Sequence, residues 1–265
     1  MAIVETMALT RCFGDIVAVD DLSISVNAGE LFGVLGPNGA GKSTVLKMLT
    51  TLLPPTSGSA RVVEFDIKRQ AAQVRRVIGY VPQLLSADGT LTGYENLLIF
   101  AKLYDIPRRE REGRIHDALA FMGLRDAAHH TVNTYSGGMI RRLEIAQSTL
   151  HRPRVLFLDE PTVGLDPAAR HVVWEMITQL RDTYGTTIIL TTHLMEEADT
   201  LCTRVAIMHR GQIAALDTPH ALKASLGKEG ATLDDVFIHV AGDTLEVGCG
   251  YHDTERTRRT TRRLG

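Results

Sequence analysis

Residues 36–43 read Gly-Pro-Asn-Gly-Ala-Gly-Lys-Ser, which fits the pattern G-x-x-x-x-G-K-[S/T] at every fixed place. An apolar run at 31–35 precedes this stretch, and a helical pattern at 42–50 follows it. Glycine lets the backbone curl until successive N–H groups face one anion, and the following helix points its N-terminal dipole at the same place. The stretch therefore predicts a phosphate-binding loop between a strand and a helix.

The loop also predicts individual contacts to a nucleotide. Lys42 is expected to reach the β- and γ-phosphates, Ser43 to offer its hydroxyl to Mg²⁺, and Thr44 to help hold the α- and β-phosphates. The remaining contacts are expected from the loop residues Asn38, Gly39, Ala40 and Gly41. A glycine-rich turn with an incidental lysine is the alternative, which the flanking strand and helix disfavour. No Asn-Lys-x-Asp segment follows to read guanine, which favours ATP.

Outward from the loop, apolar runs alternate with helical patterns. Short, largely apolar strands of this kind are typical of a parallel sheet covered on both faces. We expect such strands at 31–35, 77–81, 155–158 and 187–190, and helices at 42–50, 137–150 and 167–181. Residues 2–26 are expected to form an antiparallel β flank, and 92–124 a helical insertion. The fold class is therefore predicted as α/β, with a mostly parallel sheet, an antiparallel β flank and a helical subdomain at about 84–152.

Composition excludes several classes. The chain has 265 residues and a formal net charge of −2, so no overall basic field favours nucleic acid as a partner. The cysteines Cys12, Cys202 and Cys249 are far apart in the sequence and form no metal-binding or redox motif. The simplest interpretation is that the protein resides in a reducing cytosol. No apolar stretch approaches the roughly 20 residues that a membrane-spanning helix needs.

Two acids follow the apolar run at 155–158. Asp159 falls where the tip of a strand can hold Mg²⁺, usually through water. Glu160, one residue further, can turn toward the γ-phosphate and polarise the attacking water, since phosphoryl transfer depends mainly on positioning and charge neutralisation. An acid pair at a strand end is also common as a solvated turn. The phosphate loop elsewhere in the chain favours the catalytic interpretation.

Further motifs resemble those of ABC-type ATPases. The stretch Tyr135-Ser136-Gly137-Gly138-Met139 resembles the family signature, usually Leu-Ser-Gly-Gly-Gln. The other matching features are Gln83 (Q-loop glutamine), residues 163–166 (D-loop), His193 (switch histidine) and Phe13 (an aromatic that stacks on adenine). The resemblance runs in order over about residues 2–225. It implies an ABC ATPase domain at 1–240, with a P-loop NTPase core and a helical signature subdomain.

The resemblance also implies how the site is completed. Ser136, Gly137 and Gly138 would begin a helix with a hydroxyl and bare amides, which is a second anion site. In the family this site faces the γ-phosphate bound by the other subunit, so a head-to-tail homodimer is implied. Asp166 would link the two sites across that interface. Gln83 would contact Mg²⁺ or the attacking water and respond to a membrane partner.

His193, which alone would more often be a structural polar residue, would hydrogen-bond the γ-phosphate in this family. Some positions depart from the family pattern. Met139 and Tyr135 replace the usual glutamine and leucine of the signature, Val163-Gly164 replaces Ser-Ala, and Phe13 lacks a hydroxyl. None of these changes removes a phosphate ligand or the catalytic acid, so ATP hydrolysis is expected.

A finer resemblance is to the daunorubicin-resistance type of ABC ATPase. It rests on Tyr-Ser-Gly-Gly-Met followed by Arg141-Arg142-Leu143, and on residues 232–238. Such proteins work with separate polytopic subunits and export drugs or other amphipathic molecules. The resemblance implies a peripheral protein at the cytoplasmic face of the cell membrane. Residues 232–238 are expected either to pack as a short helix on the domain or to contact a second subunit.

Other members of the family act on ribosomes or DNA. Those of the translation type carry two ATPase halves in one chain, and those of the repair type insert a long coiled coil before the signature. This chain has one half and a modest helical segment in that interval. A catalytically silent partner is disfavoured by Lys42, Asp159, Glu160 and His193. Residues 241–265 are polar and rich in arginine, so we expect a flexible tail or a contact with anionic lipid.

Overall fold

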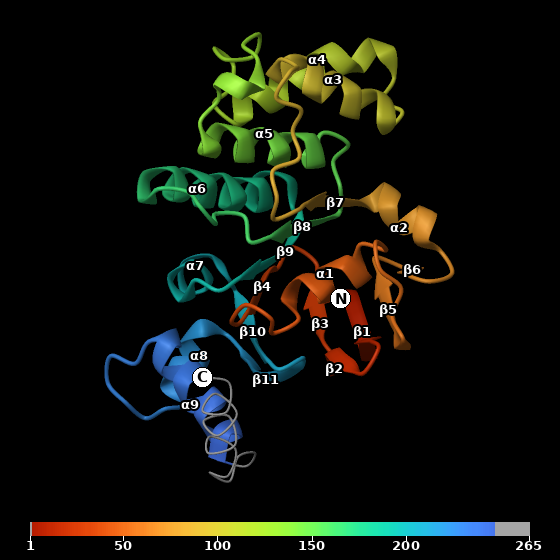
Figure 1. The fold of residues 1–265 in the computed structure, drawn as a ribbon. Coiled ribbons are helices and arrows are strands. Elements are labelled where there is room, and N and C mark those ends of the chain that lie inside the picture. Colours follow the sequence, from red (N-terminus) through yellow and green to blue (C-terminus); the bar gives the residue numbers. More distant parts are fainter. Residues whose placement is uncertain (1, 247–265) are drawn as a thin grey trace, which may run out of the picture.

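The computed structural model describes residues 2–246, with the side chains of residues 2–242 (Figure 1). Six strands form a sheet in the order β11-β10-β4-β9-β8-β7, in which every neighbouring pair except β10–β11 is parallel. Their bounds are β4 Leu31–Leu35, β7 Ile78–Val81, β8 Val155–Asp159, β9 Thr187–Thr192, β10 Arg204–His209 and β11 Gln212–Asp217. The four predicted parallel strands are confirmed, whereas β10 and β11 were not predicted.

A second sheet is antiparallel and has the order β2-β1-β5-β6, with β3 paired to β1. Its strands are β1 Ala2–Phe13, β2 Ile16–Leu22, β3 Ser25–Asn27, β5 Ser57–Val62 and β6 Phe65–Asp66. The predicted antiparallel flank is confirmed. It extends beyond residue 26, because β5 and β6 return to pair with β1 after the phosphate loop and its helix.

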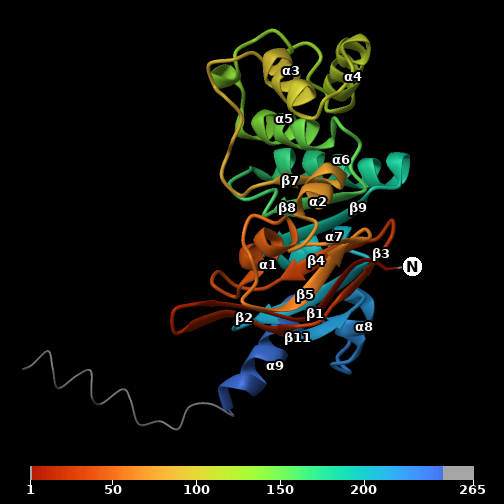
Figure 2. The same ribbon diagram turned by 90° about the vertical axis from the view of Figure 1, so that its right-hand side faces the viewer.

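Helix α1 (Lys42–Leu49) lies between the two sheets (Figures 1 and 2). Its side chains Val45, Leu46, Met48 and Leu49 are completely buried in one core with residues of both sheets. Complete burial of one such side chain stabilises a fold by about 1.5–3 kcal/mol. The helix that begins at the phosphate loop is therefore fixed from both sides. Helix α2 (Ala71–Val77) follows β6 and leads into β7.

The helical subdomain occupies one end of the molecule (Figures 1 and 2). It contains α3 Gly93–Leu103, α4 Arg108–Phe121, the 3-10 turn η1 Val132–Thr134 and α5 Gly137–Thr149. Thr92 and Glu95 form a reciprocal capping box that fixes where α3 begins. Helix α6 (Pro167–Tyr184) lies between this subdomain and the strands. The predicted helical insertion is thus confirmed.

Three helices complete the described chain: α7 Met195–Leu201, α8 Pro219–Ala224 and α9 Leu233–Glu246. Leu233 and Val236 are buried in the main core, so the segment predicted at 232–238 packs on the domain as a helix. Helix α9 continues past the expected boundary at residue 240. The rest of the expected arginine-rich tail, 247–265, lies outside the described residues. Within residues 2–246 no helix has the length and apolar character needed to cross a membrane.

Candidate functional site

The phosphate loop runs from the end of β4 to the start of α1. Gly41 has φ of 103°, and a Cβ atom there would lie 2.3 Å from the carbonyl oxygen of Ala18. A Cβ atom on Gly36 would lie equally close, at 2.3 Å, to the carbonyl oxygen of Met208. No side chain caps the N-terminus of α1. The first amides of that helix therefore face the loop, where an anion would satisfy them.

Lys42 is buried beneath this loop. Its Nζ donates to the carbonyl oxygens of Gly36 at 2.8 Å and Pro37 at 3.1 Å. It also lies 3.1 Å from Oε1 of Glu160, and the two side chains are only 4% and 5% exposed. The ammonium and the carboxylate neutralise each other where charge is poorly solvated. The structure thus brings the predicted phosphate lysine and the predicted catalytic acid into direct contact.

Glu160 follows β8 with φ of 49°, a backbone conformation that is uncommon for a residue other than glycine. Its amide donates to the carbonyl and hydroxyl oxygens of Thr191, at 3.1 and 3.0 Å. Its Oε2 atom lies 3.0 Å from Nδ1 of His193. An ionised carboxylate can only accept, so we assign the proton to Nδ1. The ends of β8 and β9 therefore aim both side chains at the phosphate loop.

Asp159 forms the second contact between β8 and the loop. Its Oδ1 atom accepts from Ser43 Oγ at 2.9 Å and from Thr191 Oγ1 at 2.6 Å. Burial, and secondarily the charge of Asp159, raises the pKa of nearby Tyr80 to about 12. Thr191 stands beside His193 in the sequence, but its role in orienting both acids was not predicted. A threonine two residues before a switch histidine is the local signal that could have indicated it.

This donor set fits Mg²⁺. The ion prefers oxygen ligands and is usually held by one or two carboxylates together with substrate phosphates. Ser43 Oγ and Asp159 Oδ1 are oxygen atoms that could serve as such ligands, and they already lie 2.9 Å apart. Among the described residues no three His, Cys, Asp or Glu side chains are grouped to hold a metal. A metal site here would therefore depend on the nucleotide for further ligands.

A hollow of about 300 Å³ lies over these groups. It is lined by the predicted residues Asn38, Gly39, Gly41, Lys42, Ser43, Thr44, Gln83 and Glu160, together with Ala18, which was not predicted. Ala40, also predicted, is buried beneath the loop rather than lining the hollow. Residues from β2, the phosphate loop, the segment after β7 and the end of β8 therefore meet at one place.

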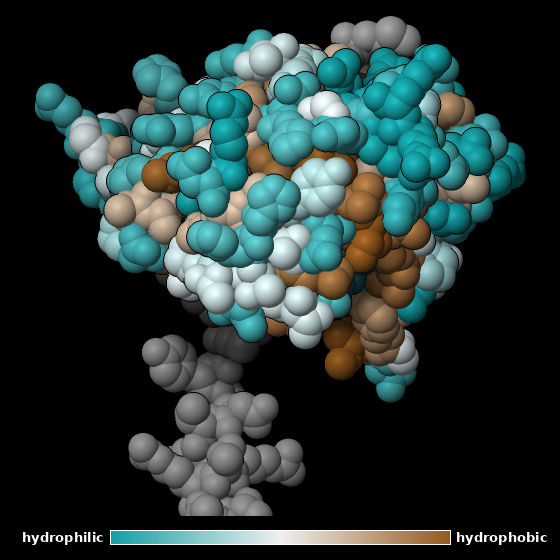
Figure 3. All heavy atoms as spheres, turned by 90° about the horizontal axis from the view of Figure 1, so that it is seen from above, coloured by the Kyte–Doolittle hydropathy of each residue, from teal (hydrophilic) through white to brown (hydrophobic). Residues whose placement is uncertain are grey.

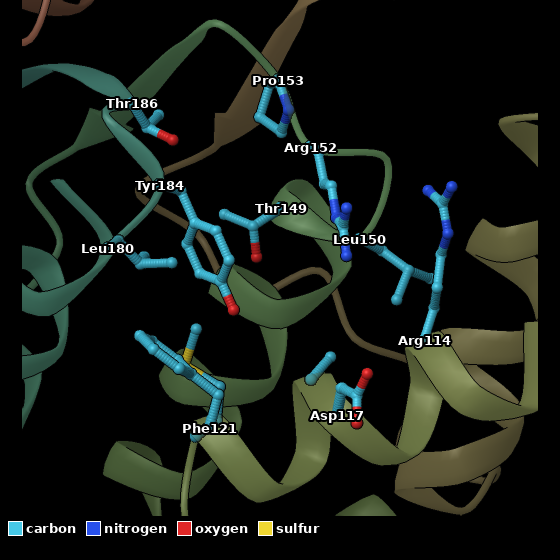
Figure 4. A pocket seen from close by; sticks show the side chains of 12 residues that line it. Arg114, Asp117, Phe121, Thr149, Leu150, Arg152, Pro153, Leu180, Tyr184 and Thr186 are labelled. Atoms are coloured by element: carbon cyan, nitrogen blue, oxygen red, sulfur yellow. The ribbon is translucent and has the colours of Figure 1, made fainter. Parts of the chain in front are cut away.

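Another hollow lies between α4, α6 and the connection from α5 to β8 (Figure 4). Phe121 and Tyr184 form part of its wall, with ring centroids 5.7 Å apart. Its volume of about 80 Å³ is well below the roughly 300–1,000 Å³ of small-molecule sites, and none of the predicted site residues lines it. Of the two, the hollow at the phosphate loop is the candidate nucleotide site.

Several predicted site residues do not line that hollow. Ser136 caps α5 by accepting from the Met139 amide at 3.3 Å, and Asp166 caps α6 by accepting from the Ala169 amide at 2.9 Å. Gly137 and Gly138 form the first turn of α5. Phe13 is 45% exposed on β1, and the Arg11 guanidinium lies 4.6 Å from its ring centroid. Within one chain these residues remain separate from the phosphate loop.

Comparison with known families identifies the chain. The family described as ABC transporter matches residues 19–163, which is more than half of the sequence. The chain belongs to the ABC transporter family. It is an ATP-binding and ATP-hydrolysing member, and we refer to it below as the ABC ATPase.

Its relatives include export and resistance proteins. The ABC ATPase is 45% identical to the daunorubicin/doxorubicin resistance ATP-binding protein DrrA of Streptomyces peucetius, over 84% of this chain and 68% of that protein. It is 40% identical to the linearmycin resistance ATP-binding protein LnrL of Bacillus subtilis, over 92% and 85%. It covers only 64% of the Nod factor export ATP-binding protein I of Sinorhizobium fredii, at 44% identity.

Solved structures agree with the fold. An ATP-binding subunit of an ABC transporter superposes with a TM-score of 0.80 at 28% identity, covering 90% of this chain and 99% of that one. A dimeric ATP-binding cassette in a post-hydrolysis state, bound to ADP and Pi, gives a TM-score of 0.72 at 26% identity, covering 81% and 98%. The α/β fold predicted from the phosphate loop is therefore that of ABC ATPase domains.

Proposed function

We propose that this ABC ATPase powers an exporter for a drug or another amphipathic molecule through a separate membrane-spanning subunit. The observation that carries the proposal is the contact of Lys42 with Glu160 in the nucleotide hollow, together with the hydrogen bond from His193 to Glu160. Two relatives are named for resistance to daunorubicin/doxorubicin and to linearmycin, which supports export as the direction and small amphipathic molecules as the cargo.

In the proposed reaction the chain positions groups rather than forming a covalent bond. Lys42 and the amides at the start of α1 would neutralise charge on the phosphates. Ser43, Asp159 and Gln83 would hold Mg²⁺, which supplies further charge neutralisation when bound. Glu160 would orient and polarise the attacking water. His193, already hydrogen-bonded to Glu160, would keep that carboxylate in place and contact the γ-phosphate.

We further propose that two copies of the chain pair head to tail. Ser136 and Gly137 are exposed at the start of α5, whereas Gly138 is buried, and none of the three lines the nucleotide hollow of its own chain. They would complete the site of the second copy, and Asp166 would link the two sites. A likeness to a dimeric cassette bound to ADP and Pi supports this arrangement.

The membrane partner is proposed to contact the helical end of the molecule. Leu84, Leu85, Ile99 and Leu103 are exposed on α3 and on the segment that follows Gln83, with Leu84 at 82% and Leu103 at 70%. Figure 3 looks down on the molecule from this end and shows hydrophobic side chains gathered at one side of the view. Because Leu84 and Leu85 directly follow Gln83, a membrane subunit bound to them would be able to influence the ATP site, and would place the ABC ATPase peripherally at the cytoplasmic face.

Fractionation of cells that produce the protein tests this proposal. We expect the wild-type chain to sediment with membranes and to cross-link to a polytopic protein. The double variant Leu84→Asp/Leu85→Asp should lose both properties while it retains ATP hydrolysis. Met7→Asp is the matched control, because Met7 is 70% exposed but lies on the distant strand β1. Sedimentation of the wild type with ribosomes instead of membranes would contradict the proposal.

A further inference from the structure

Helix α5 buries a polar face as well as an apolar one. Arg141, Glu144, Gln147 and Ser148 are between 1% and 5% exposed. Positions 141, 144 and 148 are three and four residues apart, so they lie on one side of the helix. That side faces the segment from Tyr80 to Ala87, which contains Gln83. Burial of polar groups costs free energy unless they form hydrogen bonds. The hydrogen-bond partners of these side chains therefore indicate the function of this face of α5.

Arg141 provides the closest connection to Gln83. Its Nη1 atom donates to the carbonyl oxygen of Pro82 and its Nη2 atom to that of Gln83, both at 2.8 Å. The planar guanidinium offers a fixed fork of donors, so two successive carbonyls are held in one geometry. Burial lowers the pKa of Arg141, and the charges of Glu144 and Asp159 oppose that shift. The fork therefore fixes the backbone of Gln83, which lines the nucleotide hollow together with Ser43 and Glu160.

Glu144 orients this fork and holds the segment further along. Its Oε2 atom lies 3.0 Å from Arg141 Nη1. Its Oε1 atom accepts from the amide of Ser86 and, at 3.1 Å, from the Ser86 hydroxyl. Both side chains of the ion pair are almost completely buried, at 2% and 1% exposure. Nε of Arg141 has no hydrogen-bond partner, and Oε2 of Glu144 is held by the ion pair alone. The ion pair and the hydrogen bonds to Pro82, Gln83 and Ser86 nevertheless connect α5 firmly to this segment.

The same helix begins at Ser136. An α-helix rises about 1.5 Å per residue, so Arg141 lies roughly 7.5 Å along the axis from that cap. A helix of this length moves as one body. Any displacement of Ser136 is therefore transmitted to Arg141 and, through its two hydrogen bonds, to Gln83.

We infer that Arg141, oriented by Glu144, is the positioning residue that joins Gln83 to helix α5, so that Gln83 moves together with Ser136, Gly137 and Gly138. The inference rests on the proposed function, in which Gln83 serves the site of its own chain and Ser136 serves that of the second copy. This connection then couples the two ATP sites. When the start of α5 binds at the site of the second copy, the same movement positions Gln83 at the site of its own chain.

A double-mutant cycle between Arg141 and Gln83 tests the inference. Arg141→Lys keeps the charge beside Glu144 but loses the fork. We expect kcat for Mg-ATP hydrolysis by the full chain to fall about tenfold with KM changed less than about twofold, since a 1 Å misplacement can cost up to about a hundredfold. In a Gln83→Ala background the same substitution should change kcat by less than about twofold, because the group it positions is gone.

Two further variants make the test specific. Arg111→Lys is the matched control: Arg111 also donates to a backbone carbonyl, that of Ile106 at 2.7 Å, but it does not touch the Gln83 segment. It should leave kcat unchanged in both backgrounds. Glu144→Gln keeps an acceptor for Ser86 without the charge that orients Arg141, and should show the same dependence on Gln83. Melting temperatures measured alongside identify any variant whose folding is altered.

The outcomes separate the inference from the proposed function. Equal losses from Arg141→Lys in the presence and absence of Gln83, or no loss in either, would overturn the inference alone. A Gln83→Ala chain that hydrolyses ATP at the wild-type rate would overturn both the inference and the proposed role of Gln83. A wild-type chain without Mg-dependent ATP hydrolysis would overturn the proposed function itself.

Discussion

Replacing Glu160 by glutamine is expected to lower kcat for Mg-ATP hydrolysis by at least about 100-fold, which is the range in which a positioned proton acceptor acts. Glutamine preserves the length of the side chain and one oxygen, so contacts near Lys42 and His193 can persist. It lacks the negative charge that would polarise the attacking water. Because the phosphate loop is untouched, KM for ATP should change little, and steady-state phosphate release measures both quantities.

Glu196→Gln is the matched control for this substitution. Glu196 lies on the neighbouring helix α7, its side chain is 67% exposed, and its contact with Arg170 is long, at 3.8 Å. Loss of that surface charge should leave kcat at the wild-type value, since exposed ion pairs contribute little. If Glu160→Gln instead hydrolysed ATP as fast as wild type, Glu160 would not be the residue that orients the water.

Replacing Lys42 by alanine is expected to abolish stabilisation by ATP. A ligand at about 100 times its Kd stabilises a folded protein by about 2.7 kcal/mol, which raises Tm by roughly 5–10 °C for a domain of this size. Lys42 is the buried cation of the phosphate loop, so its loss leaves the phosphate charge and Glu160 uncompensated. The variant should show a shift below about 1 °C at the same Mg-ATP concentration.

Lys47→Ala provides the comparison for Lys42→Ala. Lys47 lies one and a half turns further along the same helix, but its side chain is exposed and does not line the nucleotide hollow. We expect its ATP-induced shift in Tm to equal that of the wild type. Equal shifts in the Lys42 variant would instead show that this lysine does not bind the phosphates.

The parts of the fold that could be predicted are those that a short stretch of sequence specifies by itself. The loop at 36–43 has glycines that other residues cannot replace. Gly41, for example, has a positive φ and lies too close to the carbonyl oxygen of Ala18 to carry a side chain. Strands β4, β8 and β9 are buried along their whole length, so each carries a short apolar run that can be recognised in the sequence. Strands β10 and β11 were not predicted. They form a local hairpin in which β10 is a short buried apolar run that was overlooked, whereas β11 is half-exposed and carries no continuous apolar run.

The candidate site also contains both residues that could be predicted from sequence motifs and contacts that could not. Lys42, Ser43, Asp159 and Glu160 follow from motifs, and the structure brings them within hydrogen-bonding distance. The hydroxyl of Thr191 and the hold of Arg141 on Gln83 depend on residues 32 and 58 positions apart. The position of Thr191 before His193 is a local signal for the first contact, whereas no periodicity in the sequence marks the second, which only the folded chain shows. The roles of Ser136 and Asp166 toward a second copy stay predictions.

Light scattering of the purified Glu160→Gln chain with Mg-ATP tests the account most directly. The central claim is that two chains enclose ATP between the phosphate loop of one and Ser136 of the other. We predict that Mg-ATP doubles the mass of Glu160→Gln, and that adding Ser136→Arg, which places a bulky side chain at the start of α5, keeps it monomeric while ATP still raises its Tm. ATP binding by Glu160→Gln without any change in mass would contradict the claim.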